Sequence, residues 1–402
     1  NDVMKEKGMK RCSDNLYAQF IYRIMMIKEQ YNLTDVHICL FSPTLFLTGS
    51  SFETFRNVFF KDFAYNVGVQ FKASHFADVA DSWGISFSIW NNGETTDKNK
   101  FNYALIDNID GEIKEVGKKV VYNIDGQKTA SLWAKEDVKK NKTEDAPQMT
   151  SGINYKPNKD GCRGNLVKNA LGFYYNNSNN VDKNAQNVGM FTSCFSSGTG
   201  CSILPINFDK CTALFSARKL IEKNWVNSKD EYLAPNEEHD KYQEFVNDSI
   251  VYSLFHSASN QSSLRQVEYK DKLWDIKNEF FFMSKNDIMQ LANDYGFDFT
   301  FNDANVSNER YVYTKLQGIE LSQEAKAVLN MAIDLVNASF KYREMFDEEH
   351  PEYQIMNWDA SYYQLKAMWK EYMPEALKEF NELYKKLADK MRPMVYELGF
   401  LK

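Results

Sequence analysis

Four aromatic side chains in the first ninety residues are of the type that forms the wall of a site for a flat ring. Tyr17 and Phe20 stand three positions apart in a segment with helical periodicity, so they share one side of the helix. Phe87 and Trp90 occupy a segment with the pattern of a strand. Aromatic ring faces are the surfaces on which a purine stacks. The alternative is that these rings are core residues.

A second group of side chains suits contacts with nucleic acid. Basic residues, tyrosines and many asparagines are interleaved between positions 155 and 183. Lysine and arginine neutralise backbone phosphates, and amide side chains hydrogen-bond to base edges. The stretch predicts a DNA-binding surface, with a solvated lysine-rich loop as the alternative. The candidate residues are Lys156, Lys159, Arg163, Lys168, Tyr174 and Tyr175.

The spacing of the other reactive side chains predicts neither a metal site nor a covalent nucleophile. The six cysteines include no CxxC pair, and the five histidines show no metal-ligand spacing. Scattered cysteines in a chain of 402 residues indicate reduced thiols. We therefore expect a cytoplasmic protein without a metal cofactor.

Composition and charge limit the partners further. The net charge of −7 argues against binding nucleic acid through the electrostatic field of the whole protein. A local basic cleft is still compatible with this net charge. No apolar run approaches the ~18 residues of a membrane span, so no membrane contact is expected. Residues 1–5 do not begin with an initiator methionine and lack the apolar stretch of a signal peptide. This start indicates a processed chain or part of a longer protein.

Hydrophobic periodicity predicts an α/β arrangement in the first part of the chain. The expected order is helix, strand, helix, strand, strand, as in the latter half of an open α/β sheet. Residues 91–93 (NNG) place the last two strands within reach of a hairpin. The predicted helices begin at residues 14 and 51, and the predicted strands cover residues 36–41, 67–71, 85–90 and 101–106.

The rest of the chain changes character near residue 145. Residues 150–200 are rich in Gly, Asn and Ser, which predicts a loop-rich module with strands. From Ser322 onward the pattern is helical, with Pro374 at a second helix start. The predicted domains are therefore residues 1–145, a mixed α+β region at 146–320 and a helical region at 321–402.

Three segments of the first part, taken in order, carry a family resemblance. They are residues 14–20 (DNLYAQF), 41–49 (FSPTLFLTG) and 84–90 (GISFSIW). Together they resemble the second half of the catalytic domain of N6-adenine DNA methyltransferases of the bacterial restriction-modification type. The likeness covers about residues 10–110. That family's acidic residue with its Gly-rich donor turn, and its Asn/Asp-Pro-Pro-Tyr/Phe motif, occur nowhere in the 402 residues.

The resemblance implies a fold, a cofactor and roles for the aromatic residues. The fold would be the latter half of a Rossmann-like methyltransferase sheet, followed by a DNA-recognition region and a helical region. Phe20, with Tyr17, would contact the adenine of S-adenosylmethionine. Trp90, or Phe87 as the alternative, would stack on the flipped target adenine. The partners would be double-stranded DNA and the missing N-terminal half or a partner subunit, in a bacterium or phage.

Three hypotheses for function follow. The first is a truncated or split methyltransferase that is inactive without its N-terminal half. The second is a non-catalytic DNA-recognition or interaction subunit. The third is an unrelated α/β interaction protein. A partner or upstream segment with the Asn/Asp-Pro-Pro-Tyr/Phe motif would favour the first, whereas failure to bind any duplex at low salt would favour the third.

Overall fold

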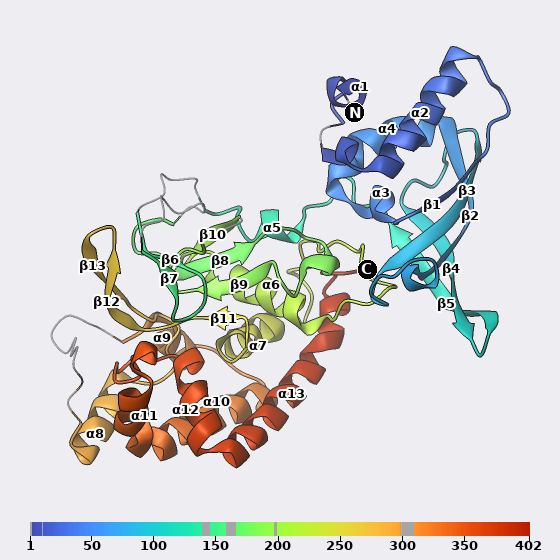
Figure 1. The fold of residues 1–402 in the computed structure, drawn as a ribbon. Coiled ribbons are helices and arrows are strands. Elements are labelled where there is room, and N and C mark those ends of the chain that lie inside the picture. Colours follow the sequence, from blue (N-terminus) through green and yellow to red (C-terminus); the bar gives the residue numbers. More distant parts are fainter. Residues whose placement is uncertain are drawn as a thin grey trace.

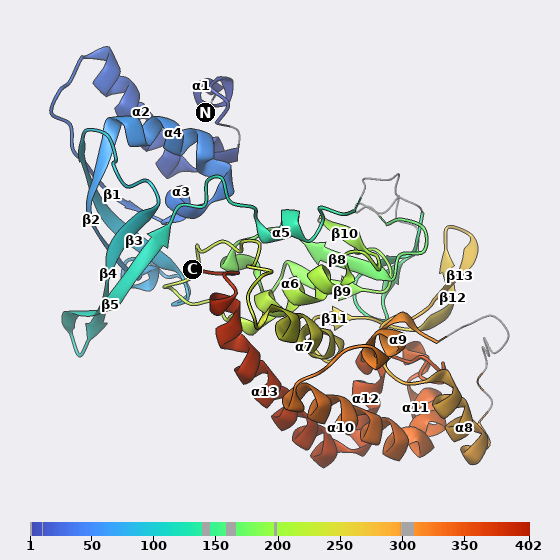
Figure 2. The same ribbon diagram turned by 180° about the vertical axis from the view of Figure 1, so that it is seen from behind.

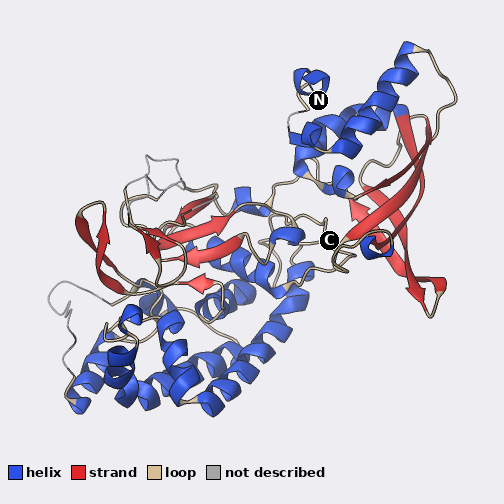
Figure 3. Cartoon of the chain, viewed as in Figure 1, coloured by secondary structure: helices blue, strands red, loops and turns tan. Residues whose placement is uncertain are grey.

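The chain folds into two lobes with separate hydrophobic cores (Figure 1). The computed structural model describes residues 2–9, 11–138, 145–157, 166–196, 199–297, 299 and 309–402. It is a mixed α/β structure with several sheets and a helical carboxyl-terminal region, as Figure 3 shows. We call residues 2–122 the sheet lobe and the described residues from 130 to 402 the large lobe.

A five-stranded sheet forms the centre of the sheet lobe, in the order β1-β3-β2-β4-β5. Strand β2 pairs in parallel with β4, while the β1–β3, β2–β3 and β4–β5 pairs are antiparallel. Strands β1, β2 and β4 therefore point in one direction. The strands are β1 (Ile38–Ser42), β2 (Phe63–Lys72), β3 (Gly84–Asn92), β4 (Lys100–Ile109) and β5 (Glu112–Tyr122).

Helices cover one face of this sheet (Figures 1 and 2). In α4, Phe55 and Phe59 stand one turn apart and are both fully buried, because i and i+4 share a helix face. They pack in the same core as Ile21 and Met25 of α2 and Trp90 of the sheet. These elements are α1 (Asp2–Glu6), η1 (Arg11–Asp14), α2 (Leu16–Gln30), α3 (Leu45–Thr48), η2 (Ser50–Phe52) and α4 (Glu53–Asp62). A further short turn, η3 (Ala73–His75), follows β2 and is not part of this layer.

The predicted helices and strands of this lobe are confirmed, but the predicted hairpin is wrong. Strand β3 pairs with β1 and β2, and β4 pairs with β2 and β5, so β2 lies between the two strands expected to form the hairpin. The turn signal at residues 91–93 instead starts a longer crossing loop. A turn sequence indicates that the chain reverses direction locally, but it does not determine which strand pairs with the strand before it in the sheet.

The large lobe combines a small sheet with a helical layer. A four-stranded sheet has the order β10-β8-β9-β11, beside the hairpin β12–β13 and the short pair β6–β7. The strands are β6 (Gln148–Met149), β7 (Tyr155–Lys156), β8 (Gly172–Asn176), β9 (Val188–Phe191), β10 (Gly200–Ile203), β11 (Ser259–Asn260), β12 (Leu264–Tyr269) and β13 (Lys272–Ile276).

Helices form most of the rest of the large lobe. The predicted starts are confirmed: Ser322 caps α10 by accepting from the Ala325 amide, and Pro374 is the first residue of α13. The helices are α5 (Ala130–Trp133), η4 (Val181–Lys183), α6 (Phe208–Leu220), α7 (Tyr242–Leu254), α8 (Lys285–Tyr295), α9 (Tyr311–Gln317), α10 (Gln323–Ser339), η5 (Phe340–Tyr342), α11 (Arg343–Glu349), η6 (Pro351–Tyr353), α12 (Tyr362–Tyr372) and α13 (Pro374–Glu397).

One hydrophobic core runs through the large lobe from α5 to the carboxyl terminus. It joins Tyr174 of β8, Phe215 of α6 and Trp369 of α12. Residues 146–320 and 321–402, which the sequence divides into two regions, therefore share one packed interior. Among the described residues, none of the helices combines the length and apolar character that a bilayer-spanning segment needs.

Polar contacts join the two lobes. Lys119 of β5 forms an ion pair with Asp230 at 2.6 Å, and the Thr48 hydroxyl donates to the Lys229 carbonyl at 2.6 Å. Gln70 of β2 donates to the Trp225 carbonyl at 2.7 Å. These contacts tie the loop after α6 to the sheet.

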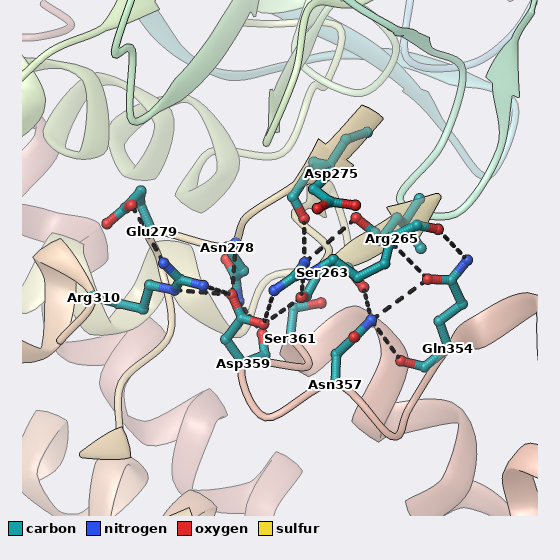
Figure 4. Close-up of polar contacts among 12 residues, drawn as sticks. Ser263, Arg265, Asp275, Asn278, Glu279, Arg310, Gln354, Asn357, Asp359 and Ser361 are labelled. Carbon is teal, nitrogen blue, oxygen red and sulfur yellow. Dashed lines mark hydrogen bonds and ion pairs between the residues drawn. The ribbon is translucent and has the colours of Figure 1, made fainter. Parts of the chain in front are cut away.

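A buried ionic network holds the strands and helices of the large lobe together (Figure 4). Asp359, just before α12, accepts from Arg310 Nε at 2.9 Å and from Arg265 Nη2 at 3.1 Å. The Asn278 amide donates to the same carboxylate at 3.0 Å, and Ser263 donates from its hydroxyl. The carboxylate and both guanidinium groups are almost completely buried, so each charge depends on the others for compensation.

Removing this carboxylate should destabilise the large lobe strongly. We expect Asp359→Ala to lower the free energy of unfolding by about 3–5 kcal/mol, because two buried guanidinium groups lose their shared counterion. Urea denaturation followed by circular dichroism measures the change. The control is Asp389→Ala, which breaks an exposed i,i+3 pair with Arg392 and should cost less than about 1 kcal/mol. Equal losses in the two variants would contradict this role for Asp359.

Candidate functional site: an aromatic pocket at the ends of three strands

An apolar pocket lies on the face of the five-stranded sheet that carries Phe41 and Phe87. Its volume is about 420 Å³. The lining is predominantly aromatic and aliphatic, with a few polar groups at the rim. The lining residues are Phe41, Val69, Phe71, His75, Phe76, Phe87, Ile106, Asp107, Asn108 and Ile113.

Strand register explains why the rings meet. Phe87 of β3 stands opposite Phe41 of β1 on one side and Val69 of β2 on the other. Directly opposed residues of neighbouring strands project from the same face of a sheet, so these three side chains form a row. The rings of Phe41 and Phe87 have centroids 4.8 Å apart.

The loop after β2 completes the pocket. The ring centroid of Phe76 lies 5.7 Å from that of Phe41 and 5.3 Å from that of Phe71. Its side chain is 70% exposed, so one ring face is open to a ligand. Phe41, Phe71 and Ile106 lie near the carboxyl ends of β1, β2 and β4, which is the edge of an open α/β sheet where ligands bind.

The polar rim is organised by one carboxylate. Asp107 accepts from Lys72 Nζ at 2.6 Å and from His75 Nε2 at 2.9 Å. The hydrogen bond from Lys72 is the main cause that lowers the pKa of Asp107, so this group stays ionised at neutral pH. The pocket therefore combines aromatic faces with a charged, hydrogen-bonding edge, which suits a planar heteroaromatic ring.

The two residues predicted to stack on a target base lie on opposite faces of β3. Phe87 lines the pocket, whereas Trp90 is fully buried beneath α3 and α4. The Trp90 ring packs against Phe59 at 4.8 Å, and its Nε1 donates to the Ser88 hydroxyl at 2.9 Å. Because side chains alternate along a strand, positions 87 and 90 cannot face the same ligand.

The residues predicted to contact the cofactor differ in exposure. Tyr17 is half-buried and stacks on Phe52 with centroids 6.0 Å apart. Phe20 is 67% exposed on α2 and belongs to an open apolar stripe with Leu16, Ile27 and Tyr31. Helix α2 covers the Trp90 face of the sheet, so Phe20 and the pocket around Phe87 lie on opposite sides.

The predicted DNA-binding residues divide into three groups. Lys156 of β7 and Lys168 are exposed. Lys159 and Arg163 lie outside the described residues. Tyr174 and Tyr175 are buried in β8, where the Tyr175 hydroxyl donates to Asn187 Oδ1 at 3.0 Å, so neither ring presents an open face.

Sequence reasoning missed Phe76 altogether and treated Phe41 as scaffold. Phe76 follows the predicted strand at residues 67–71, and a loop directly after a parallel strand is a position where binding residues concentrate. That signal could be read only if β2 were known to run parallel to β1 and β4. The relative direction of these strands cannot be predicted from the sequence alone.

Within the described residues, one group of side chains has metal-ligand geometry: Glu349, His350 and Glu371. All three are at the surface of the large lobe, and His350 Nε2 lies 3.4 Å from Glu371. Nothing else at this place indicates a ligand, so we assign it no role.

Comparisons with models of protein families, with curated proteins and with solved structures return no match for this chain. The function must therefore be argued from the residues and from the pocket itself.

The opposite placement of Phe76 and Trp90 leads to a stability test. We expect Trp90→Ala to lower the free energy of unfolding of the sheet lobe by about 3–5 kcal/mol, because it opens a cavity among packed aromatic rings. Phe76→Ala should change it by less than about 0.5 kcal/mol, because most of that side chain is already in water. Urea denaturation monitored by tryptophan fluorescence, or by circular dichroism for the Trp90 variant, measures both. Comparable losses would show that the pocket ring is structural.

Proposed function

We propose that this chain supplies part of an N6-adenine DNA methyltransferase, with S-adenosylmethionine as methyl donor and double-stranded DNA as substrate. The remainder of the catalytic domain would come from an N-terminal half or a partner subunit. The observation that carries the proposal is the aromatic pocket of Phe41, Phe76 and Phe87 at the carboxyl ends of parallel strands.

The strand order supports this reading. Strand β3 runs antiparallel between β1 and β2, which are themselves parallel. The order along the chain, α2, β1, α4, β2 and β3, is the one expected for the latter half of an open α/β sheet. Helix α2 before β1 and helix α4 between β1 and β2 cover one face, as the resemblance implies.

The open edge of β1 offers a place for the rest of the sheet. Among the described strands, β1 pairs only with β3, so its other edge is free to accept a further strand. Just before β1 in the chain, α2 exposes an apolar stripe that includes Leu16 and Phe20. An exposed apolar stripe and an unpaired strand edge in one lobe favour a catalytic domain completed by another segment.

The exposed aromatic rings of the pocket are better suited to binding the target base than to packing in the hydrophobic core. A base cannot be methylated while stacked in a duplex, so such enzymes rotate it into a pocket lined by aromatic faces. Phe76 and Phe87 provide such faces, and Asp107 with Asn108 provides hydrogen-bonding groups at the rim. We therefore assign base stacking to Phe87, the alternative residue, together with Phe76, and a structural role to Trp90.

The cofactor contacts would be shared with the missing half. Phe20 is accessible on α2 and can form part of the wall for the adenine of S-adenosylmethionine. The acidic residue, the Gly-rich turn and the Asn/Asp-Pro-Pro-Tyr/Phe motif would all be supplied by the N-terminal half or the partner subunit. The exocyclic amine is activated in this family by hydrogen bonds to that motif, and this chemistry needs no metal.

The second candidate is a DNA-recognition or interaction subunit without catalytic activity. The absence of both family motifs from the sequence favours it. The two functions differ in one observable: a recognition subunit binds duplex DNA but gives no methyl transfer with any complementing segment.

The decisive experiment combines complementation with a pocket variant. We expect transfer of labelled methyl groups to duplex DNA only when the chain is supplemented with a segment carrying the missing motifs. Phe76→Ala should then lower kcat/KM by about 10–100-fold, because one stacking face is worth ~1–3 kcal/mol. Phe76→Tyr is the matched control and should retain most of the activity.

A fluorescence readout tests base binding without chemistry. A duplex with 2-aminopurine at the target adenine should brighten when the complemented chain rotates that base out of the stack. Phe76→Ala and Phe87→Ala should change this signal, whereas the exposed β5 variant Val116→Ala should leave it unchanged. Methyl transfer that is insensitive to both phenylalanine variants would rule out the pocket as the base site.

A further inference from the structure

A second pocket, in the large lobe, has a lining of a different kind. It lies between the turn that follows α7 and the outer side of α12, with a volume of about 290 Å³. Cations, hydroxyls and aromatic rings make up the lining, and none of its described members is acidic. The lining residues are His256, Ser257, Ser259, Tyr353, Tyr362, Tyr363, Lys366, Ala367 and Lys370.

Two lysines give the pocket its charge. Lys366 and Lys370 stand one helical turn apart on α12, so their side chains lie on the same helix face. Lys366 is half-buried over the ring of Tyr362, with Nζ 5.4 Å from the ring centroid. Neither lysine forms an ion pair with any carboxylate in the described ranges of the chain. Burial and the neighbouring Lys370 both lower the pKa of Lys366, as expected of cations that lack a counterion.

A buried hydroxyl in the pocket has no partner. Ser259 is 3% exposed, and its Oγ makes no hydrogen bond within the structure. A buried hydroxyl without a partner is a vacant hydrogen-bonding group, and at the wall of a pocket it is available to a ligand. Ser259 is one of the lining residues, and its Oγ lies just beneath the surface, so a change of side-chain rotamer presents the hydroxyl to an acceptor in the pocket.

His256 adds a neutral donor. Its Nδ1 accepts from the Ala258 amide at 2.9 Å, so the ring proton resides on Nε2. Burial, reinforced by Lys219 and Lys366, lowers the pKa of His256 to about 3, which keeps the ring uncharged at neutral pH. The pocket therefore offers ammonium groups, hydroxyls and an imidazole N–H, which are all hydrogen-bond donors.

We propose that this pocket binds a phosphate group through Lys366, Lys370 and Ser259. A tetrahedral oxyanion supplies the negative charge that the lysines lack and the acceptor that the Ser259 hydroxyl lacks. The volume leaves room for an attached sugar. The phosphate can belong to a nucleic-acid backbone or to a free mononucleotide. The site does not depend on the methyltransferase proposal, because it lies in the other lobe.

The first test is binding of inorganic phosphate and of deoxyadenosine monophosphate to the full chain, measured by calorimetry. Lys366→Gln with Lys370→Gln should weaken phosphate binding by about 10-fold or more, since it removes two charge-assisted contacts. The control is Lys378→Gln with Lys385→Gln, which removes the same charge from exposed positions of α13 and should change nothing.

Ser259→Ala separates a ligand-binding role from a structural one. Because the hydroxyl has no partner in the structure, its removal should leave the unfolding midpoint unchanged or raise it. The same variant should weaken phosphate binding about 2–10-fold, the worth of one hydrogen bond. A lower unfolding midpoint with unchanged phosphate binding would overturn the assignment.

Measuring the binding of duplex DNA at different salt concentrations distinguishes the two sources of the phosphate. If it belongs to the DNA backbone, the slope of log affinity against log salt should fall by about 2 in the double lysine variant, and the α13 control should keep the original slope. An unchanged slope together with lost mononucleotide binding would assign the pocket to a free nucleotide. The proposal fails if the double lysine variant matches the control for phosphate, mononucleotide and duplex alike.

Discussion

The large lobe depends on the carboxylate of Asp359. This one group pairs with two guanidinium groups, from Arg265 and Arg310, that are buried with it, and Glu279 places a second carboxylate 3.8 Å from Arg310. The groups that donate hydrogen bonds to Asp359 come from β12, from the segment after β13 and from the start of α9. The Asp359 carboxylate therefore connects elements nearly a hundred positions apart in sequence. Buried charges are costly when unpaired, and this cost disfavours any arrangement in which the hairpin separates from the helices.

That constraint explains why the helical region is not a separate body. The segment before α12 completes the ionic network, while α12 and α13 pack into the same core as β8 and α6. The phosphate pocket at α12 depends on this arrangement, because α12 and the turn after α7 form its two walls.

In the sheet lobe, the alternation of side chains along one strand separates stability from binding. The even positions of β3, Ser86, Ser88 and Trp90, face the helices and are buried. Phe87 faces the other way, into a row with Phe41 that ends in an accessible pocket. A ring among many other rings contributes packing energy, whereas a ring with a free face is available to a ligand. This difference is the reason for our proposal that Phe87 and Phe76, and not Trp90, stack on the target base.

The sequence by itself determined the local structure. Periodicity and caps located α2, α4, α10 and α13, because a helix end at Ser322 or Pro374 is a matter of neighbouring residues. Alternation and β-branched or aromatic content located β1 to β4 for the same reason. The resemblance of residues 84–90 put Trp90 first as the base-stacking candidate, with Phe87 as the alternative, before the surroundings of either were known.

Only the tertiary structure decided which of these residues meet. Strand order is set by long-range pairing, so β2 came to lie between β3 and β4, against the turn signal at residues 91–93. Pairing direction brought Phe76 to the pocket, and the closing of the core buried Trp90, Tyr174 and Tyr175. The Asp359 network could not be read from spacing, because its charges are compensated by partners that only folding brings together.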